Sequence, residues 1–224
     1  GRYSEWARLC LAQALMAQGR DVMARRELKE LRQSGDAELA RRARLMFNES
    51  ELQLGRQKVV GERLSREADQ SNPEVVYLSA RAAFQAGRLE EAAAKIQELL
   101  KGSAGGARLH HAAALLEAEI LLAMNRPAAA QTALLRFIDK TLNGEFQHEA
   151  FNLLRRAREA FAPEEDNPLP PEVPGWIASE NKPGRQADAL FLAALWLAEK
   201  NRKVEALGLL ESLLAVHAGH RLES

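Results

Sequence analysis

Histidine is the side chain most often used as a metal ligand or proton carrier, and the sequence contains five. His110 and His111 are adjacent, so on a helix they point to different sides and cannot bind one metal ion together. His217 and His220 are three residues apart and share a helix face, but no cysteine or carboxylate cluster completes the three or four ligands of a metal site. We therefore expect no metal site, and we interpret this pair as histidines that complement the dipole at a helix C-terminus.

Carboxylate pairs are the next candidates, because general acid–base catalysis uses carboxyl groups held in a cleft with shifted pKa values. Glu90 and Glu91 open an expected helix, where acidic side chains interact favourably with the N-terminal dipole. The acidic run 164–166 lies in a proline-rich stretch and is expected to be solvated. Neither group predicts acid–base catalysis.

Other catalytic and cofactor motifs are missing from the sequence. The run GSAGG at 102–106 lacks the Lys-Ser/Thr pair of a phosphate-binding loop and is interpreted as a linker between helices. No G-x-S-x-G, H-E-x-x-H or C-x-x-C occurs. The single cysteine, Cys10, lies between two leucines and is expected to be packed as a small apolar side chain. We expect neither a catalytic site nor a cofactor, and hence not an enzyme.

The balance of charges argues against a nucleic-acid partner and leaves an acidic protein partner possible. Lys+Arg and Asp+Glu both number 31, so the formal net charge is zero, whereas a general nucleic-acid binder needs an excess of cations. Arginine clusters at 25–26, 41–44 and 155–158 have acidic neighbours and are interpreted as solvated faces, or alternatively as a docking patch for an acidic partner. No run of about 20 apolar residues exists, so we expect no transmembrane segment in this chain.

Composition and periodicity predict the elements that position these side chains. Alanine and leucine dominate, aromatics make up only 5% of residues, and strand-forming residues are scarce, which favours an all-α fold. Leu78–Leu100 reads as two amphipathic helices that Gly87 separates. Glycine adopts a positive φ without strain, so this segment predicts an antiparallel helix hairpin.

The same pattern recurs along the chain. Asparagine is the next best residue for a left-handed turn, so it can replace glycine. The turn residues are separated by 36, 32, 38 and 76 positions, and the last interval predicts one more hairpin with an obscured turn. Repeats of this length indicate a solenoid. The predicted turn residues are Gly19, Gly55, Gly87, Asn125 and Asn201.

The turn residue, an alanine five positions later and a bulky apolar residue four positions after that resemble the tetratricopeptide repeat. Gly19/Ala24/Leu28 and Gly87/Ala92/Ile96 match best, and the sets that begin at Asn125 and Asn201 match with a changed turn residue. The repeats are degenerate, because the usual Trp and Tyr of the first helix are mostly absent and the final proline is clear only at Pro73. The resemblance implies an α-solenoid, a right-handed superhelix of about five to six antiparallel helix hairpins.

The domain prediction has three parts: repeats over 1–162, a Pro-rich irregular segment over 163–184, and a C-terminal hairpin over 185–224. Six of the eight prolines lie in the middle segment, which therefore interrupts helices expected at 145–162 and 185–200. Trp176 and Ile177 provide an apolar anchor that could dock on the repeats. The segment could replace a helix of the obscured hairpin, bind a partner, or act as a linker.

The resemblance places a partner on the concave surface lined by the first helix of each hairpin. Projection of these helices gives the possible lining residues, in three groups. Some could equally pack between hairpins: Trp6, Phe84 and Phe191. Gln13 and Asp188 are further possible lining residues. The predicted partner-binding residues are Arg42, Glu49, Gln53, Tyr77, Arg81, Gln85 and Glu119.

The leading functional hypothesis is therefore a non-catalytic scaffold that binds a protein or peptide, as a module of a larger assembly. The alternative is the non-catalytic helical arm of a larger, cell-wall-type enzyme. Single-stranded RNA recognition by related repeats is a third hypothesis, which the zero net charge opposes. The Lys/Asn clamp that some tetratricopeptide proteins use for chaperone tails has no counterpart here. Similar degenerate repeats in bacterial envelope machinery favour the periplasmic side, with the cytoplasm as the alternative, and the oligomeric state stays open.

Overall fold

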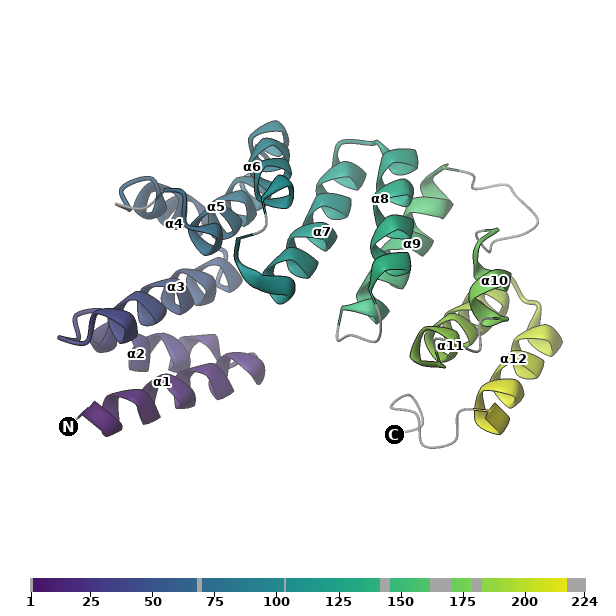
Figure 1. Ribbon diagram of the computed structural model, residues 1–224, viewed down its shortest axis with the longest axis horizontal. Helices are drawn as coiled ribbons and strands as arrows, with labels where there is room; N and C mark the ends of the chain where they lie inside the picture. Colours follow the sequence, from purple (N-terminus) through teal and green to yellow (C-terminus); the bar gives the residue numbers. More distant parts are fainter. Residues whose placement is uncertain are drawn as a thin grey trace. The chain divides into compact units, whose positions relative to one another are not determined.

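The computed structural model describes residues 2–67, 70–102, 104–141, 146–161, 171–178 and 183–216. All regular secondary structure within these ranges is helical (Figure 1), which confirms the all-α prediction. The chain divides into two compact units, Gly1–Ala113 and Ala114–Ser224. In each unit the helices pack in neighbouring pairs.

In the first unit, α1 packs on α2, α3 on α4 and α5 on α6, and each pair contacts the next through α2 with α3 and α4 with α5. The first helices of the pairs also contact one another in chain order, α1 with α3 and α3 with α5. The helices are α1 (Arg2–Ala17), α2 (Asp21–Leu31), α3 (Ala37–Gln53), α4 (Gln57–Leu64), α5 (Pro73–Gln85), α6 (Leu89–Lys101) and the start of α7 (Gly106–Ala123).

The second unit is built from the rest of α7 and five further helices. Here α8 packs on α9, α11 on α12, and α11 also contacts α9 and α10. The helices are α8 (Pro127–Lys140), α9 (Gln147–Phe161), α10 (Val173–Ile177), α11 (Pro183–Glu199) and α12 (Lys203–Val216). Of these, α9 and α11 match closely the helices expected at 145–162 and 185–200.

Each predicted turn residue has the left-handed backbone that the sequence called for. At Gly87, where φ is 75°, the amide donates to the Phe84 carbonyl at 2.9 Å, and the next amide, of Arg88, donates to the Ala83 carbonyl at 2.9 Å. This pair of bonds satisfies carbonyls that the helix end would leave free. The same two bonds recur at the other turns, whose φ values are 69° at Gly19, 73° at Gly55, 55° at Asn125 and 61° at Asn201.

The register after the turn is equally regular. The position five residues beyond it is buried in every repeat, because a small side chain there lets the second helix approach the first closely. Ala92 and Ile96 on α6 are fully buried. The corresponding small residues are Ala24, Val60, Ala130 and Ala206, and the large ones that are also buried are Leu28, Leu64 and Leu134.

Between Asn125 and Asn201 the chain forms α8, then α9, and the described part of the Pro-rich segment forms only the five-residue α10. The predicted extra hairpin stays a prediction. Trp176 on α10 is 5% exposed, packs edge-on against Phe151 at 5.4 Å between ring centroids, and donates its indole N–H to Asp139 Oδ1 at 3.2 Å. The predicted docking of Trp176 is therefore confirmed, whereas residues 162–170 and 179–182 lie outside the described part.

Cys10 corrects one sequence prediction. Its thiol is exposed, not packed. The buried face of α1 is formed by Leu9, Ala12 and Leu15, and one helix position turns the side chain by about 100°. Cys10 therefore points away from the core although leucines flank it on both sides.

The turns give the first testable prediction. Replacing Gly87 by alanine forces a Cβ into the left-handed region and is expected to lower the free energy of unfolding by about 1 kcal/mol. Gly61→Ala is a matched control in the same unit, because Gly61 lies inside α4 and an added Cβ would meet only Arg88 Nη2 at 3.5 Å. That change should instead stabilise by roughly 0.5–1 kcal/mol. Urea unfolding followed by circular dichroism measures both, and equal effects would contradict the turn geometry.

Candidate functional site

The first helices of the first unit carry most of the predicted partner-binding residues. We call the surface formed by α1, α3 and α5 the first-helix face. Its helices contact one another in chain order, so side chains from different repeats can meet there. Arg42, Glu49 and Gln53 lie on α3, while Tyr77, Arg81 and Gln85 lie on α5. Glu119 lies on α7, in the second unit, and is half-buried.

Three of the predicted residues meet directly. Arg81 Nη1 lies 3.4 Å from Glu49 Oε1, which joins α5 to α3. The Arg81 guanidinium carbon also lies 5.9 Å from the centre of the Tyr77 ring. Only 18% of the Arg81 side chain is exposed, so most of the arginine is covered while it contacts both partners.

The other predicted residues of this face are more loosely arranged. Arg42 lies over the Trp6 ring of α1, with 5.4 Å from the guanidinium carbon to the ring centre, and pairs with Glu38 at 2.7 Å. Gln53 and Gln85 are exposed at the ends of their helices. The structure therefore joins Glu49, Tyr77 and Arg81, while Arg42 belongs to a second group.

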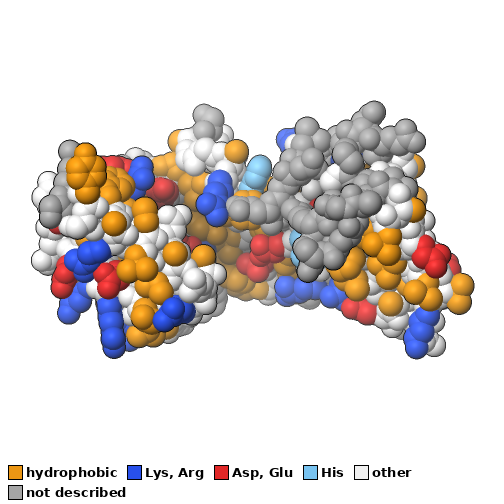
Figure 2. Space-filling model, turned by 90° about the horizontal axis from the view of Figure 1, so that it is seen from below, with side chains coloured by type: hydrophobic (Ala, Val, Ile, Leu, Met, Phe, Trp, Pro, Cys, Tyr) orange, Lys and Arg blue, Asp and Glu red, His pale blue; other side chains and the backbone are white. Residues whose placement is uncertain are grey.

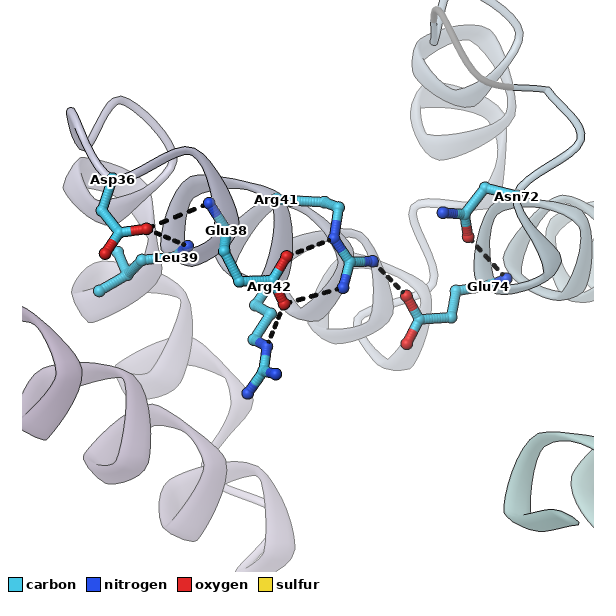
Figure 3. Close-up of polar contacts among 7 residues, drawn as sticks. All are labelled: Asp36, Glu38, Leu39, Arg41, Arg42, Asn72 and Glu74. Atoms are coloured by element: carbon cyan, nitrogen blue, oxygen red, sulfur yellow. Dashed lines mark hydrogen bonds and ion pairs between the residues drawn. The ribbon is translucent and has the colours of Figure 1, made fainter. Parts of the chain in front are cut away.

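That second group links the beginnings of α3 and α5 (Figure 3). Arg41 lies between two carboxylates, with Nε 2.9 Å and Nη2 3.0 Å from the Glu38 oxygens and Nη1 2.6 Å from Glu74 Oε2. Charge-assisted bidentate contacts of this kind are the stronger class of hydrogen bond. The Asp36 and Asn72 side chains cap the two helices, accepting from the Glu38 and Glu74 amides. The group therefore fixes neighbouring repeats to each other.

Its electrostatics follow from these contacts. Hydrogen bonds from Arg41 and then Arg42 lower the pKa of Glu38 from 4.5 to about 2. The two carboxylates in turn raise the pKa of Arg41. Glu38 and Arg41 therefore stay charged around neutral pH, and neither is poised to transfer a proton.

In the second unit the structure corrects one expected lining residue and decides between the two alternatives for another. Asp188 on α11 is 1% exposed, so it cannot line an open surface. Phe191, for which packing between hairpins was the alternative, packs against the apolar core of the second unit and lies 6.1 Å from the ring of half-buried His148. Ala187, Ala189 and Leu190 are buried on several sides of α11, so the side on which Asp188 lies is covered as well.

A buried carboxylate surrounded by arginines is the feature that sequence reasoning missed. Only 4% of the Glu51 side chain is exposed, and it lies on α3 behind the first-helix face. Arg25 Nε lies 3.1 Å from its Oε1, Arg56 Nη1 3.3 Å from the same oxygen, and Arg63 Nη2 3.9 Å from Oε2. The three arginines come from α2, from the turn before α4 and from α4, so one carboxylate ties three elements together.

A fourth arginine completes this group, which we call the Glu51 cluster. Arg32, at the end of α2, stacks its guanidinium over the Phe47 ring at 3.9 Å, and Arg63 lies over the same ring at 5.2 Å. Arg63 also donates to the buried Asn48 side chain at 2.6 Å. A sequence signal existed, because Glu51 follows Asn48 and Ser50 on the apolar face of α3, where polar residues are rare without partners.

Metal and acid–base chemistry find no support in the described residues. No group of three or more His, Cys, Asp or Glu side chains there could hold a metal ion. His110 Nε2 lies 2.9 Å from the Ala104 carbonyl oxygen, and His217 and His220 fall outside the described part. Glu90 and Glu91 occupy the first turn of α6 as expected, and the acidic run 164–166 is not among the residues described.

Two carboxyl groups outside these clusters have shifted pKa values. Burial raises the pKa of Glu117 on α7, and nearby Arg136 opposes this. A hydrogen bond from Arg202 lowers the pKa of Glu205. Figure 2 shows basic and acidic side chains lying next to one another on the face in view, among apolar ones. No helix in the described ranges is long and apolar enough to cross a membrane.

The pKa of Glu38 generates a pH prediction. A carboxyl group whose folded pKa lies below its unfolded value adds stability above the unfolded pKa, and this stability is lost as the pH falls through the folded pKa. Glu38→Gln is therefore expected to unfold at lower urea concentration than the parent near neutral pH, and the difference should shrink between pH 4.5 and about 2. Glu62→Gln, at an exposed position of α4, is the control. A pH-independent difference at Glu38 would refute the ion-pair account.

The Glu51 cluster generates a second prediction. Glu51→Gln leaves three or four guanidinium groups close together without their shared carboxylate, and breaking a buried ion pair typically costs about 3 kcal/mol. We expect a loss of that order in the free energy of unfolding, measured by urea titration. Glu98→Gln, exposed on α6, should change it by less than about 0.5 kcal/mol. A neutral effect of Glu51→Gln would show that the cluster contributes nothing to the fold.

Comparison of the sequence with protein-family models finds no match. Comparison with curated proteins finds no match either. The inference of function therefore rests on the contacts described above.

Proposed function

We propose that this protein is a non-catalytic scaffold that binds a protein or peptide on its first-helix face. In this proposal the helix pairs form a tetratricopeptide-like solenoid, and the first-helix face is its concave side. The single observation that carries the proposal is the contact of α1 with α3 and of α3 with α5, because consecutive first helices then form one continuous surface. The second helices α2 and α4 pack behind it on α3 and α5.

The side chains of this face are suited to binding. Aromatic and arginine side chains are the usual anchors of protein interfaces, and Tyr77 and Arg81 lie side by side on α5. Arg81 is already oriented by Glu49, so little conformational entropy is lost when a partner contacts it. Exposed Gln53 and Gln85 can donate and accept hydrogen bonds at the edge of the same area.

A role as a module of a larger assembly has its own support in the second unit. Val204 is 84% exposed on α12, and Leu207 and Leu214 of the same helix are 59% and 58% exposed. Val204, Leu207 and Leu214 are three and seven positions apart, so they share one face of α12. An apolar outer face is typical of a helix that another element covers.

The proposal predicts that a double variant, Tyr77→Ala with Arg81→Ala, loses partners without losing the fold. Affinity capture from a cell extract, read by mass spectrometry and by chemical cross-linking, should recover partners with the parent chain and cross-link them to α3 and α5. The variant should retain less than about a tenth of that recovery, since anchor residues contribute most of the binding energy.

The matched control changes two exposed residues of the second helices, Lys58→Ala on α4 and Glu98→Ala on α6. It should recover the same partners as the parent. Equal recovery with the Tyr77/Arg81 variant, or cross-links confined to α2, α4 and α6, would overturn the assignment of the binding surface.

A further inference from the structure

The Glu51 cluster contains more arginines than its single carboxylate can neutralise. Four arginines, Arg25, Arg32, Arg56 and Arg63, surround a single buried carboxylate. One carboxylate offers about four lone-pair positions, and Arg25, Arg56 and Arg63 lie 3.1, 3.3 and 3.9 Å from its oxygens. The group therefore keeps an excess of guanidinium donors beside a carboxylate that cannot accept many more.

Arg32 shows the excess most clearly. Its buried Nε has no hydrogen-bond acceptor among the described residues, and its guanidinium carbon lies 3.9 Å from the centre of the Phe47 ring. Burial and the positive charges of Arg63 and Arg25 lower the pKa of Arg32, and only Glu51 acts in the opposite direction. Like charges held together in this way are stabilised by any anion that enters between them.

The cluster is open to such an anion. The side chains of Arg25, Arg56 and Arg63 are 33%, 48% and 32% exposed, although the Glu51 side chain is nearly inaccessible. Two acidic residues of α2 near the cluster in sequence, Glu27 and Glu30, are engaged elsewhere, because both pair with Arg8 of α1. An anion from outside the chain can therefore reach the guanidinium groups from solvent.

We propose that the Glu51 cluster is a binding site for a carboxylate of an acidic peptide segment in a partner protein. The guanidinium fork matches a carboxylate in two parallel hydrogen bonds, and these arginines already hold one carboxylate, that of Glu51. A nucleic acid fits less well, because Phe47 is only 6% exposed beneath two guanidinium groups and offers no face for base stacking. That the site binds a peptide rests on the proposed role in protein binding. That it binds an anion rests on the contacts of the Glu51 cluster itself.

The test is fluorescence anisotropy of a labelled hexaglutamate peptide titrated with the full chain at low salt. We expect saturable binding that weakens as sodium chloride screens the charges. Arg32→Gln should weaken it about tenfold, because one charge-assisted contact is lost. Arg32→Lys keeps the charge and should recover part of the affinity.

The control is Arg26→Gln, which removes one positive charge from an exposed position of the same helix and should weaken binding less than about twofold. Circular dichroism and urea unfolding verify that each variant is folded. Equal weakening by Arg26→Gln and Arg32→Gln, or the absence of saturable binding by the parent, would overturn the proposal. Binding of inorganic phosphate or of a labelled oligonucleotide in place of hexaglutamate, lost in Arg32→Gln, would overturn the peptide as occupant.

The binding and capture assays together test the anion site and the first-helix face separately. The Tyr77→Ala/Arg81→Ala variant changes only the first-helix face, so it should bind hexaglutamate as the parent does while losing captured partners. If hexaglutamate fails to bind but capture by the first-helix face persists, only the anion site is wrong. If hexaglutamate binds and capture is unaffected by the double variant, the first-helix face is wrong.

Discussion

Close approach of two helices across a left-handed turn is the constraint on which the rest of the structure depends. The turn residue reverses the chain within a few positions. Hydrogen bonds from its amide and from the next amide then satisfy carbonyls at the end of the first helix. The small residue five positions later then lies against the first helix with no exposed surface, as Ala92 does. Because the same turn and the same register occur at five places, the side chains that remain outside fall into comparable positions in every repeat.

This regularity explains why so much of the fold could be predicted. Spacing alone located the turn residues, including Asn125 and Asn201, since only glycine and asparagine adopt positive φ readily. The spacing could not show α10, because a five-residue helix among prolines has no periodic signal. It also failed at Cys10, whose leucine neighbours suggested burial although a helix turns each successive side chain to a new direction.

The candidate sites were harder to predict, for a physical reason. Arg81, Tyr77 and Glu49 could be placed on one surface because they lie on first helices at helical spacing, but their contacts depend on how α3 and α5 pack. The Glu51 cluster depends on four arginines between positions 25 and 63. No local pattern relates such residues, because they meet only after three elements have packed together.

Charge is used in two different ways in the first unit. Around Arg41 the signs balance, and the group joins α3 to α5. Around Glu51 the positive charges outnumber the single negative charge, and the excess arginine charge lies near solvent, as at Arg56.

The contacts of the first unit also have a kinetic consequence. Every helix pair there that packs together is separated by no more than one other helix along the chain. Contacts so close in sequence require only short loops to form, so the entropy of loop closure is small and the folding barrier is low. A ribosome that has released the first three pairs has already released every helix that the first two pairs contact, so those two pairs can fold during synthesis.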